Sequence, residues 1–438
     1  MTLGGWVFWL TVSMFTSPDE VGFATTALSI ANLIGGLLGL GLEYPLMREL
    51  AIGRRSAFGT ILAFEMLILL SLSPVMYFIG VYIYGTGYSP YMTLGVGLLL
   101  FSGLAFVGKF SALAILETRY VVLYDVLAII MRFVVGVVLV VASYGGLGIV
   151  AASLVQASIV GMALTLLCIS RIGFAKVYPK ELIHLLKIGI GNFPSRLVGI
   201  MTNNLSIVFL AVFTSNPVEV GLFFIAIAIS FVAAGFASSL ATMALPVSSM
   251  MRTDASTASL RLGLAVTSPL LAAIFASPGV PLSLISPSYI EASETLRILA
   301  LAMLLIVVVT NVITRLNHLQ KLKQLTALGL VHLSTFLVLF PILTVYMGAI
   351  GAPIVILLSS AAATIYSLKW LGRRDLRSLA VALLIIASTW ILSIAASSLP
   401  PSIIFALSLT VGGLINLMSG ELTLSEVIYV LKTVSNRT

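Results

Sequence analysis

Apolar segments of roughly membrane-spanning length recur along almost the whole chain. A transmembrane helix needs about 20 mostly apolar residues. That requirement predicts about fourteen spans, of which the first is short. The predicted spans are 2–16, 21–42, 57–80, 92–116, 121–142, 147–170, 188–213, 218–246, 258–277, 293–316, 324–346, 350–370, 378–398 and 402–420.

The composition agrees with this pattern. Hydrophobic residues make up 60% of the 438 residues and charged residues only 9%, whereas a soluble domain has about 25% charged residues. At a mean hydropathy of +1.17, a soluble fold would expose larger apolar patches than water tolerates. The sequence therefore predicts an all-α integral membrane protein. Its single cysteine, Cys168, excludes an intramolecular disulfide.

Lysine and arginine concentrate in alternate loops. The loops between them contain Asp19, Glu20 and Glu219 but no lysine or arginine. Because basic residues concentrate on the cytoplasmic side, we expect a multi-pass protein of the plasma membrane with both termini in the cytoplasm. The net charge of +8 then reflects topology, and no nucleic-acid partner is expected. The basic loop and tail residues are Arg48, Arg54, Arg55, Arg119, Arg171, Lys176, Lys180, Lys187, Arg252, Arg261, Lys321, Lys323, Lys369, Arg373, Arg374, Arg377, Lys432 and Arg437.

Two motifs recur about 200 residues apart. FTSPDEVGFATTALSIA at 15–31 returns as FTSNPVEVGLFFIAIAIS at 213–230, with Gly22 matching Gly221. YGGLGIVAASL at 144–154 returns as YMGAIGAPIVILL at 346–358, with Gly148 matching Gly351. Proline, Asp or Asn, and glycine favour tight turns between antiparallel spans. Their common order and offset indicate an internal repeat.

The repeat predicts the domain organisation. An even number of spans per repeat, six, gives parallel repeats related by an axis along the membrane normal. We expect two six-helix lobes around a central cleft, which suits alternating access, and two additional C-terminal helices. The predicted parts are an N-terminal lobe at 1–170, an amphipathic cytoplasmic linker at 171–187, a C-terminal lobe at 188–370, and two helices with a tail at 371–438.

The first 50 residues resemble the opening of a known family. The similar features are the SPDEVG turn at 17–22, the ALSIANL run at 27–33 and GLGLEYPLMREL at 39–50, together with the YGGLGIVAASL turn. They resemble polysaccharide-type flippases of the multidrug/oligosaccharidyl-lipid/polysaccharide (MOP) superfamily. The two additional C-terminal spans also resemble those of lipid II flippases.

The resemblance implies a function and partners. Such proteins move polyprenyl-diphosphate-linked sugars from the cytoplasmic to the outer leaflet through a cleft between lobes, for cell-surface polysaccharide or glycan synthesis. The expected partners are the lipid-linked glycan, membrane lipids and enzymes of glycan assembly. A monomer without a cofactor or metal is expected. The motifs do not specify the sugar or its lipid carrier.

Several ionisable residues fall inside predicted spans, where each is a functional-site hypothesis because its burial is costly. The basic candidates for binding a diphosphate are Arg132, Arg196 and Lys109, since arginine matches phosphate oxygens bidentately and lysine offers a point charge. Within the predicted spans these charges fall in the half of the membrane nearer the cytoplasm. The acidic candidates are Glu65 and Asp125, as coupling residues or as partners in structural ion pairs, Glu65 with Lys109 and Asp125 with Arg132.

Polar residues deep in spans also need partners in protein or water. Asn203 and Asn204 in span 188–213 are therefore expected to face the cleft and the substrate. Gln156 could line the same space or form a helix–helix hydrogen bond.

Enzyme chemistry finds no support in the sequence. The three histidines, His184, His318 and His332, lack the spacing of metal ligands, and no P-loop motif is present. Two alternatives to a flippase remain open. One is an ion-coupled small-molecule or multidrug exporter of the same superfamily, and the less favoured one is a membrane enzyme of glycan assembly.

Overall fold

The computed structural model describes residues 3–173, 177–200, 204–251, 256–319 and 321–422. These residues form helices and connecting turns without a β-strand, which confirms the predicted all-α class. Ten helical stretches are long and apolar enough to cross a membrane. Two of them, at 118–172 and 322–370, each comprise two helices around a tight turn. The predicted number of fourteen spans is not confirmed by these ten stretches.

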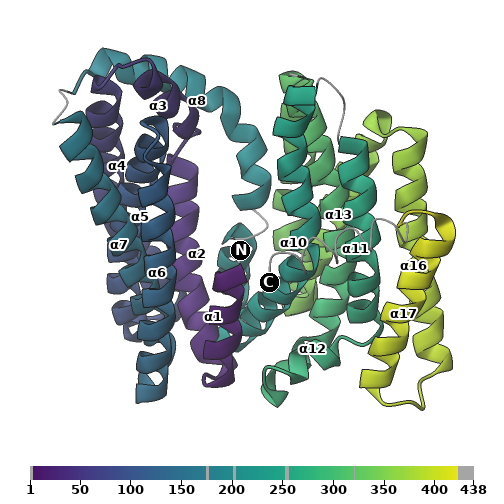
Figure 1. The fold of residues 1–438 in the computed structure, drawn as a ribbon. Coiled ribbons are helices and arrows are strands. Elements are labelled where there is room, and N and C mark those ends of the chain that lie inside the picture. Colours follow the sequence, from purple (N-terminus) through teal and green to yellow (C-terminus); the bar gives the residue numbers. More distant parts are fainter. Residues whose placement is uncertain (1–2, 174–176, 201–203, 252–255, 320, 423–438) are drawn as a thin grey trace. The chain divides into compact units, whose positions relative to one another are not determined.

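The chain divides into two compact units, residues 2–224 and 225–438, which are considered separately (Figure 1). Helix α10 begins in the first unit and continues into the second. The first unit contains α1 (Leu3–Met14), α2 (Pro18–Leu38), α3 (Glu43–Ala51), α4 (Ser56–Tyr84), α5 (Ser89–Ala114), α6 (Thr118–Leu139), a π-helical turn η2 (Val140–Tyr144), α7 (Gly145–Ile172), α8 (Pro179–Ile200), α9 (Ser206–Thr214) and the start of α10 (Pro217–Met251).

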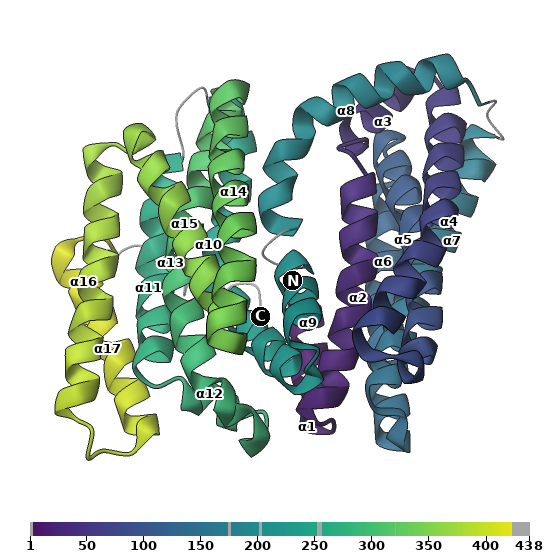
Figure 2. The ribbon, with the colours of Figure 1, turned by 180° about the vertical axis from the view of Figure 1, so that it is seen from behind.

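The second unit is a bundle followed by a helical hairpin, and Figure 2 shows its α14 and α15 most clearly. Helix α11 packs against α13, α16 and α17, and α15 packs against α13 and α14. Its elements are α11 (Ser256–Ala276), α12 (Gly279–Ser283), α13 (Ser293–His318), α14 (Leu322–Met347), α15 (Gly351–Ser367), α16 (Arg373–Ala395) and α17 (Pro401–Ser419).

Helix α7 occupies the middle of the first unit, in contact with α2, α5 and α6. In lipid, helices associate through close packing more than through a hydrophobic driving force, and small residues permit the closest approach. A Cβ atom on Gly161 of α7 would lie 2.6 Å from the carbonyl oxygen of Phe101 of α5. One on Gly108 of α5 would lie 2.8 Å from the backbone nitrogen of Thr165. Glycine is therefore required at both points.

Two predicted spans differ from the observed helices. The predicted span 21–42 ends earlier, because α2 stops at Leu38 and Gly41 adopts a positive φ of 72° before α3 begins. A Cβ on Gly41 would lie 2.4 Å from the Gly189 carbonyl oxygen, so this turn packs directly on α8. The predicted span 188–213 covers parts of two described helices, since α8 starts at Pro179, within the predicted linker, and α9 begins at Ser206.

The two matched glycines of the first motif meet in space. A Cβ on Gly22 would lie 1.8 Å from the carbonyl oxygen of Pro217, and one on Gly221 would lie 1.9 Å from that of Pro18. The first turns of α2 and α10 therefore pack reciprocally, each with its glycine against the proline of the other. Any larger residue at either position would force these turns apart.

Candidate functional site

Arg132 forms a polar centre inside the first unit. Its Nη1 donates a hydrogen bond to Oε1 of Gln156 at 3.1 Å, which joins α6 to α7. The guanidinium carbon lies 4.2 Å from the ring centre of Phe8 and 5.9 Å from that of Trp9, both on α1. A cation over an aromatic face is stabilised by the ring quadrupole, more strongly when desolvated. Three helices thus surround one partly buried positive charge.

The local sequence explains this arrangement. Phe8 and Trp9 are only 1% and 5% exposed, although α1 is short. The ring of Phe8 lies over α6 because Gly136, one turn beyond Arg132, has no side chain. A Cβ there would lie 2.4 Å from Cε2 of Phe8. Gly136 therefore admits the aromatic ring that covers the guanidinium.

The charge of Arg132 is not neutralised by an acidic side chain within the described part of the chain. Its Nε is buried and has no hydrogen-bond partner among the same residues. A buried guanidinium with an unsatisfied donor is energetically expensive. Its Nε–H can donate a hydrogen bond to a phosphate oxygen, for which the planar guanidinium is well matched. Arg132 is therefore the strongest candidate for binding an anion in this unit.

The position of Arg132 along α6 differs from the sequence-based expectation. It lies fourteen residues from Thr118, about 21 Å along the helix, and only about 10 Å from Leu139. The helix begins three residues before the predicted span and ends earlier, so Arg132 lies beyond its midpoint rather than in the half nearer Thr118.

The ion pairs differ from both predicted pairs. Lys109 of α5 binds Asp125 of α6 at 2.5 Å between Nζ and Oδ2. These residues lie at similar distances from the α5–α6 turn, so antiparallel packing brings them together. Asp125 and Arg132 are seven residues apart on one helix, about 10 Å, which is too far for a pair. With side chains 39% and 33% exposed, Lys109 and Asp125 form a half-exposed, locally neutral pair.

Glu65 does not pair with Lys109. It is 1% exposed on α4, and a Cβ on Gly103 of α5 would lie 3.5 Å from its Cγ. Gly103 lies six residues before Lys109, so the carboxylate and the ammonium face different turns of α5. Glu65 is a deeply buried acid, separate from the Lys109–Asp125 pair.

The other predicted site residues are only partly described. Asn204 is partly buried directly before α9. The backbone of Arg196 belongs to α8, but its side chain lies outside the described part, and Asn203 lies outside the described residues. The first unit thus brings Arg132 and Gln156 together, with Lys109 and Asp125 in a separate pair.

Sequence reasoning missed a second polar cluster, which joins both repeated motifs. Oε2 of Glu20 accepts hydrogen bonds from the backbone N–H of Gly146 and from the Tyr91 hydroxyl, both at 2.6 Å. Glu20 lies in the first turn of α2, and Gly146 lies in that of α7. The carboxylate therefore satisfies a backbone donor at an electropositive helix terminus. The SPDEVG motif places Glu20 in a turn, but only the fold identifies Gly146 as its hydrogen-bond partner.

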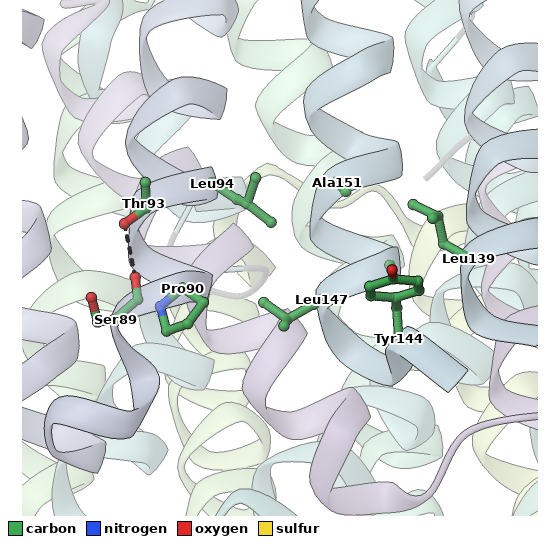
Figure 3. A pocket seen from close by; sticks show the side chains of 9 residues that line it. Ser89, Pro90, Thr93, Leu94, Leu139, Tyr144, Leu147 and Ala151 are labelled. Atoms are coloured by element: carbon green, nitrogen blue, oxygen red, sulfur yellow. Dashed lines mark hydrogen bonds between the residues drawn. The ribbon is translucent and has the colours of Figure 1, made fainter. Parts of the chain in front are cut away.

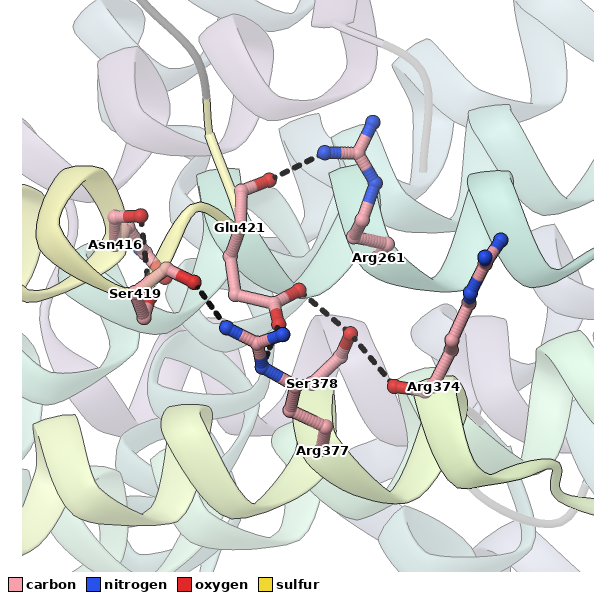
Figure 4. A network of polar contacts seen from close by, with 7 residues as sticks. All are labelled: Arg261, Arg374, Arg377, Ser378, Asn416, Ser419 and Glu421. Atoms are coloured by element: carbon pink, nitrogen blue, oxygen red, sulfur yellow. Dashed lines mark hydrogen bonds and ion pairs between the residues drawn. The ribbon is translucent and has the colours of Figure 1, made fainter.

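Many loop arginines have structural partners. In the second unit, Arg377 donates to the Ser419 carbonyl oxygen at 2.6 Å, and Arg261 to that of Glu421 at 2.9 Å (Figure 4). The Glu421 carboxylate in turn accepts a hydrogen bond from Ser378 at 2.6 Å. Cations near helix C-termini satisfy free carbonyls and oppose the helix dipole. This network fastens α17 to α11 and α16, so its arginines give no argument for substrate binding.

A similar explanation applies to the first unit. Arg171, at the end of α7, binds Glu117 at 3.2 Å beside a pocket of about 290 Å³ that also includes Gly53 and Arg55. The C-termini of α3, α5 and α7 meet around this pocket. Their partial negative charges favour the arginines already present. This end of the unit is called the basic end below, and the end containing Glu20 and Gly146 is called the opposite end.

Solved structures define the class of this fold. The chain is similar to the lipid II flippase MurJ in an inward closed conformation with a TM-score of 0.69, at 16% identity over 95% of this chain and 97% of that chain. It matches an inward-facing multidrug resistance MATE family transporter of the MOP superfamily with a TM-score of 0.61, at 15% identity over 87% and 96%. A Vibrio cholerae MATE transporter, VcmN, matches with a TM-score of 0.52, at 14% identity over 85% and 95%. The protein therefore has the fold of MOP-superfamily transporters and flippases.

The family follows from the sequence itself. A family model described as polysaccharide biosynthesis protein matches residues 12–277, so the chain belongs to that family. Among curated proteins, no match is found. The family and the solved structures confirm the resemblance to the MOP superfamily. Together they show the fold of MOP-superfamily transporters and flippases, in a chain with ten described helical stretches long and apolar enough to cross a membrane.

Proposed function

We propose that this protein moves polyprenyl-diphosphate-linked sugars from the cytoplasmic to the outer leaflet by alternating access, for cell-surface polysaccharide synthesis. The observation that most supports this is Arg132, a partly buried guanidinium with no acidic partner in the described residues and with a buried Nε donor that has no hydrogen-bond partner there. The family description and the similarity to a flippase of a lipid-linked sugar support the same cargo class.

The proposal gives each polar group a role. Arg132 would bind a diphosphate oxygen, with Gln156 fixing its guanidinium plane. Arg196, Asn203 and Asn204 remain proposed contributors to substrate binding. Lys109 is proposed as a weaker contributor, because Asp125 already neutralises its charge.

The proposed setting has the basic end in the cytoplasm and both termini on that side. The protein is proposed to act as a monomer in the plasma membrane, beside enzymes of glycan assembly. We propose that the protein is organised for transport in the four parts predicted from the repeat, which are residues 1–170, 171–187, 188–370 and 371–438.

Transport in reconstituted vesicles tests the proposal. A fluorescent lipid-diphosphate sugar is offered, and its arrival in the opposite leaflet is followed with a membrane-impermeant quencher. Arg132→Ala should lower the initial rate at least tenfold, because a charge-assisted hydrogen bond contributes about 1.5–3 kcal/mol. Arg132→Lys should restore part of it. Arg119→Ala is the matched control, since Arg119 is on the same helix with its side chain 74% exposed.

Wild-type rates for Arg132→Ala would contradict the proposed phosphate site. The multidrug exporter is the second candidate, favoured by the buried carboxylate of Glu65 and by the MATE-like fold. Transport of a lipophilic cation, lost in Glu65→Gln and unaffected by Arg132→Ala, would support the exporter instead.

A further inference from the structure

The pocket of about 290 Å³ at the basic end of the first unit, called the basic-end pocket below, has a charged lining made of Arg55, Glu117 and Arg171. It opens where α3, α5 and α7 end. Helices α5 and α7 belong to stretches long enough to cross a membrane, so their ends lie at its surface. The volume is just below the range of about 300–1,000 Å³ for whole small molecules. It suits a headgroup whose hydrocarbon chains stay outside the pocket.

Three left-handed turns build the basic-end pocket. Gly53, Leu116 and Gly173, which follow α3, α5 and α7, adopt positive φ angles of 86°, 62° and 87°. The backbone N–H groups of these turns bond carbonyl oxygens of the helices that they end. These bonds, each 2.9 Å, run from Arg54 to Glu49, from Glu117 to Ala112 and from Gly173 to Ile169. The turns themselves therefore cap the three helices, and no arginine is needed for that purpose.

The arginines of the basic-end pocket are not bonded to backbone carbonyls within the described part of the chain. In the second unit, by contrast, Arg261, Arg315 and Arg377 each donate to one. The side chain of Arg55 forms no hydrogen bond or ion pair with a described residue. Arg171 approaches Glu117 through Nε at 3.2 Å, and neither of its Nη groups has a hydrogen-bond partner among those residues. The guanidinium donors at this pocket therefore remain available to a ligand.

Positive charge exceeds negative charge around the basic-end pocket. The carboxylate of Glu117 is shared between Arg171 at 3.2 Å and Arg119 at 3.8 Å. With Arg55, three arginines are accompanied by one carboxylate. The helix C-termini reduce this excess without reversing it, because each contributes about half a negative charge, part of which the turns already satisfy. Arginine matches phosphate oxygens in geometry and charge, so the lining favours a phosphate group.

Exposed apolar side chains lie beside this charge. Leu116 is 85% exposed between the lining residues Ile115 and Glu117, and Ile52, next to Gly53, is 61% exposed. A leucine at positive φ is unfavourable, yet here it extends an apolar side chain outward beside arginines. In a membrane lipid the phosphate adjoins hydrocarbon, and basic pockets between transmembrane helices bind such headgroups. The combination therefore fits a lipid better than a soluble phosphate.

The larger depression at the opposite end of the unit lacks this chemistry. It is an apolar groove of about 690 Å³ between α5, α6 and α7, and its lining includes Leu94, Leu139 and Leu147 (Figure 3). No acidic or basic side chain lines it. The groove gives no argument for an anion, so the phosphate chemistry is particular to the basic-end pocket.

We infer that the basic-end pocket binds the phosphate group of an anionic membrane phospholipid. The phosphate lies between Arg55 and Arg171, with the acyl chains beside Leu116 and Ile52. A lipid bound there links the ends of α3, α5 and α7. This site is distinct from Arg132 and does not depend on the cargo.

Photo-crosslinking to the purified full-length protein in neutral detergent tests the inference without requiring transport. The probe is phosphatidylglycerol with a diazirine in its headgroup, and labelled peptides are mapped by mass spectrometry. Labelling is expected at residues 50–55, 115–119 and 171–172. Unlabelled phosphatidylglycerol should compete, whereas phosphatidylcholine and inorganic phosphate should not.

Substitutions separate the pocket from general attraction of charge. Arg55→Ala and Arg171→Ala should each reduce the labelling about fivefold or more, because each removes one charge-assisted contact with the phosphate. Arg55→Lys should keep most of it, since the charge remains. Arg373→Ala is the matched control, because Arg373 is also exposed near a helix start and does not line the pocket.

Four results would overturn the inference. Equal competition by phosphatidylcholine would show that the headgroup charge is not recognised, and full competition by inorganic phosphate would show a site for a free anion. Stronger competition by a polyprenyl phosphate than by phosphatidylglycerol would assign the pocket to the cargo. The fourth result is unchanged labelling in an Arg55→Ala protein that elutes as a single folded species. Loss of sugar-lipid transport alone would contradict the proposed function and leave this site supported.

Discussion

The two repeats share a backbone plan and differ in the chemistry at equivalent places. After both α5 and α13 the chain turns with the same hydrogen bond, from Glu117 N to Ala112 O and from Lys321 N to Leu316 O, each 2.9 Å. Where α6 and α7 are joined by the Arg132–Gln156 bond, α14 and α15 are joined by His332 and Ser359 at 3.4 Å. Ser359 is the counterpart of Gln156. One repeat thus uses a guanidinium and an amide where the other uses an imidazole and a hydroxyl.

The same asymmetry occurs at the far ends of these helices. Beside the start of α5 the first repeat has an apolar groove lined by Leu94, Leu139 and Leu147, whereas at the start of α13 the second repeat has the Glu294–Arg297 ion pair. Backbone geometry depends on glycines and turns, which both repeats retain. Side-chain chemistry can change at such positions without altering helix packing. The comparison suggests that cargo contacts belong mainly to the first repeat, and four predictions test it, from the largest expected effect to the smallest.

The first prediction concerns the feature that the repeats share. Gly22→Ala and Gly221→Ala should each cost about 3 kcal/mol or more, because each Cβ would lie within 2 Å of a backbone carbonyl oxygen. Folded yield and melting temperature in detergent measure this. Gly235→Ala, on α10 with no heavy atom within 4 Å of its Cβ, is the control. A mild effect at one glycine alone would refute the reciprocal contact.

The second prediction compares the two interhelical polar pairs. Arg132→Gln should reduce lipid-diphosphate transport about 10- to 100-fold, the equivalent of one charge-assisted contact. His332→Gln should leave the rate within about twofold, since His332 is buried and joins α14 to α15. Initial rates in vesicles at equal protein content measure both. Equal losses would show that the second repeat also contributes to the substrate site.

The third prediction concerns the matched acidic residues. Glu20→Gln should destabilise the protein by about 2 kcal/mol, because the carboxylate accepts two short hydrogen bonds, one of them from a backbone donor. Tyr91→Phe should cost about 1 kcal/mol, since it removes only one of them. Glu219→Gln should cost less than Glu20→Gln, because Oε2 of Glu219 has no hydrogen-bond partner among the described residues. Thermal unfolding in detergent ranks the three, and a reversed order would contradict the assigned contacts.

The smallest effect is expected for the Lys109–Asp125 pair. The side chains of Lys109 and Asp125 are 39% and 33% exposed. Partly exposed ion pairs contribute about 0.2–1 kcal/mol to stability. A double-mutant cycle with Lys109→Ala and Asp125→Ala should give a coupling energy in that range, and transport should fall no more than about threefold. A tenfold loss in Lys109→Ala that Asp125→Ala does not share would make Lys109 a direct substrate contact.

Some features were accessible from the sequence because they depend on composition and local pattern. Lipid as the solvent follows from the 9% charged residues, and the helical class follows from backbone satisfaction in lipid. The helix starts at Pro18 and Pro217 follow from the turn motifs. The buried arginine was recognisable because charge inside a span is costly.

The interaction partners of the charged residues could not be predicted from composition and local pattern. The predicted pairs matched charges by estimated depth alone, whereas the observed Lys109–Asp125 pair depends on which faces of α5 and α6 meet. The aromatic cover on Arg132 comes from α1, more than 120 residues earlier in the chain. It also depends on the missing side chain of Gly136.

The sequence by itself therefore determined the solvent, the class of fold, the repeat and the presence of charge within the membrane, because these depend on residue type and periodicity. The tertiary structure alone decided that Glu20 binds Gly146 and that Gly22 packs on Pro217. The physical reason is that contacts between helices depend on their rotation and spacing, and small residues far apart in sequence set both.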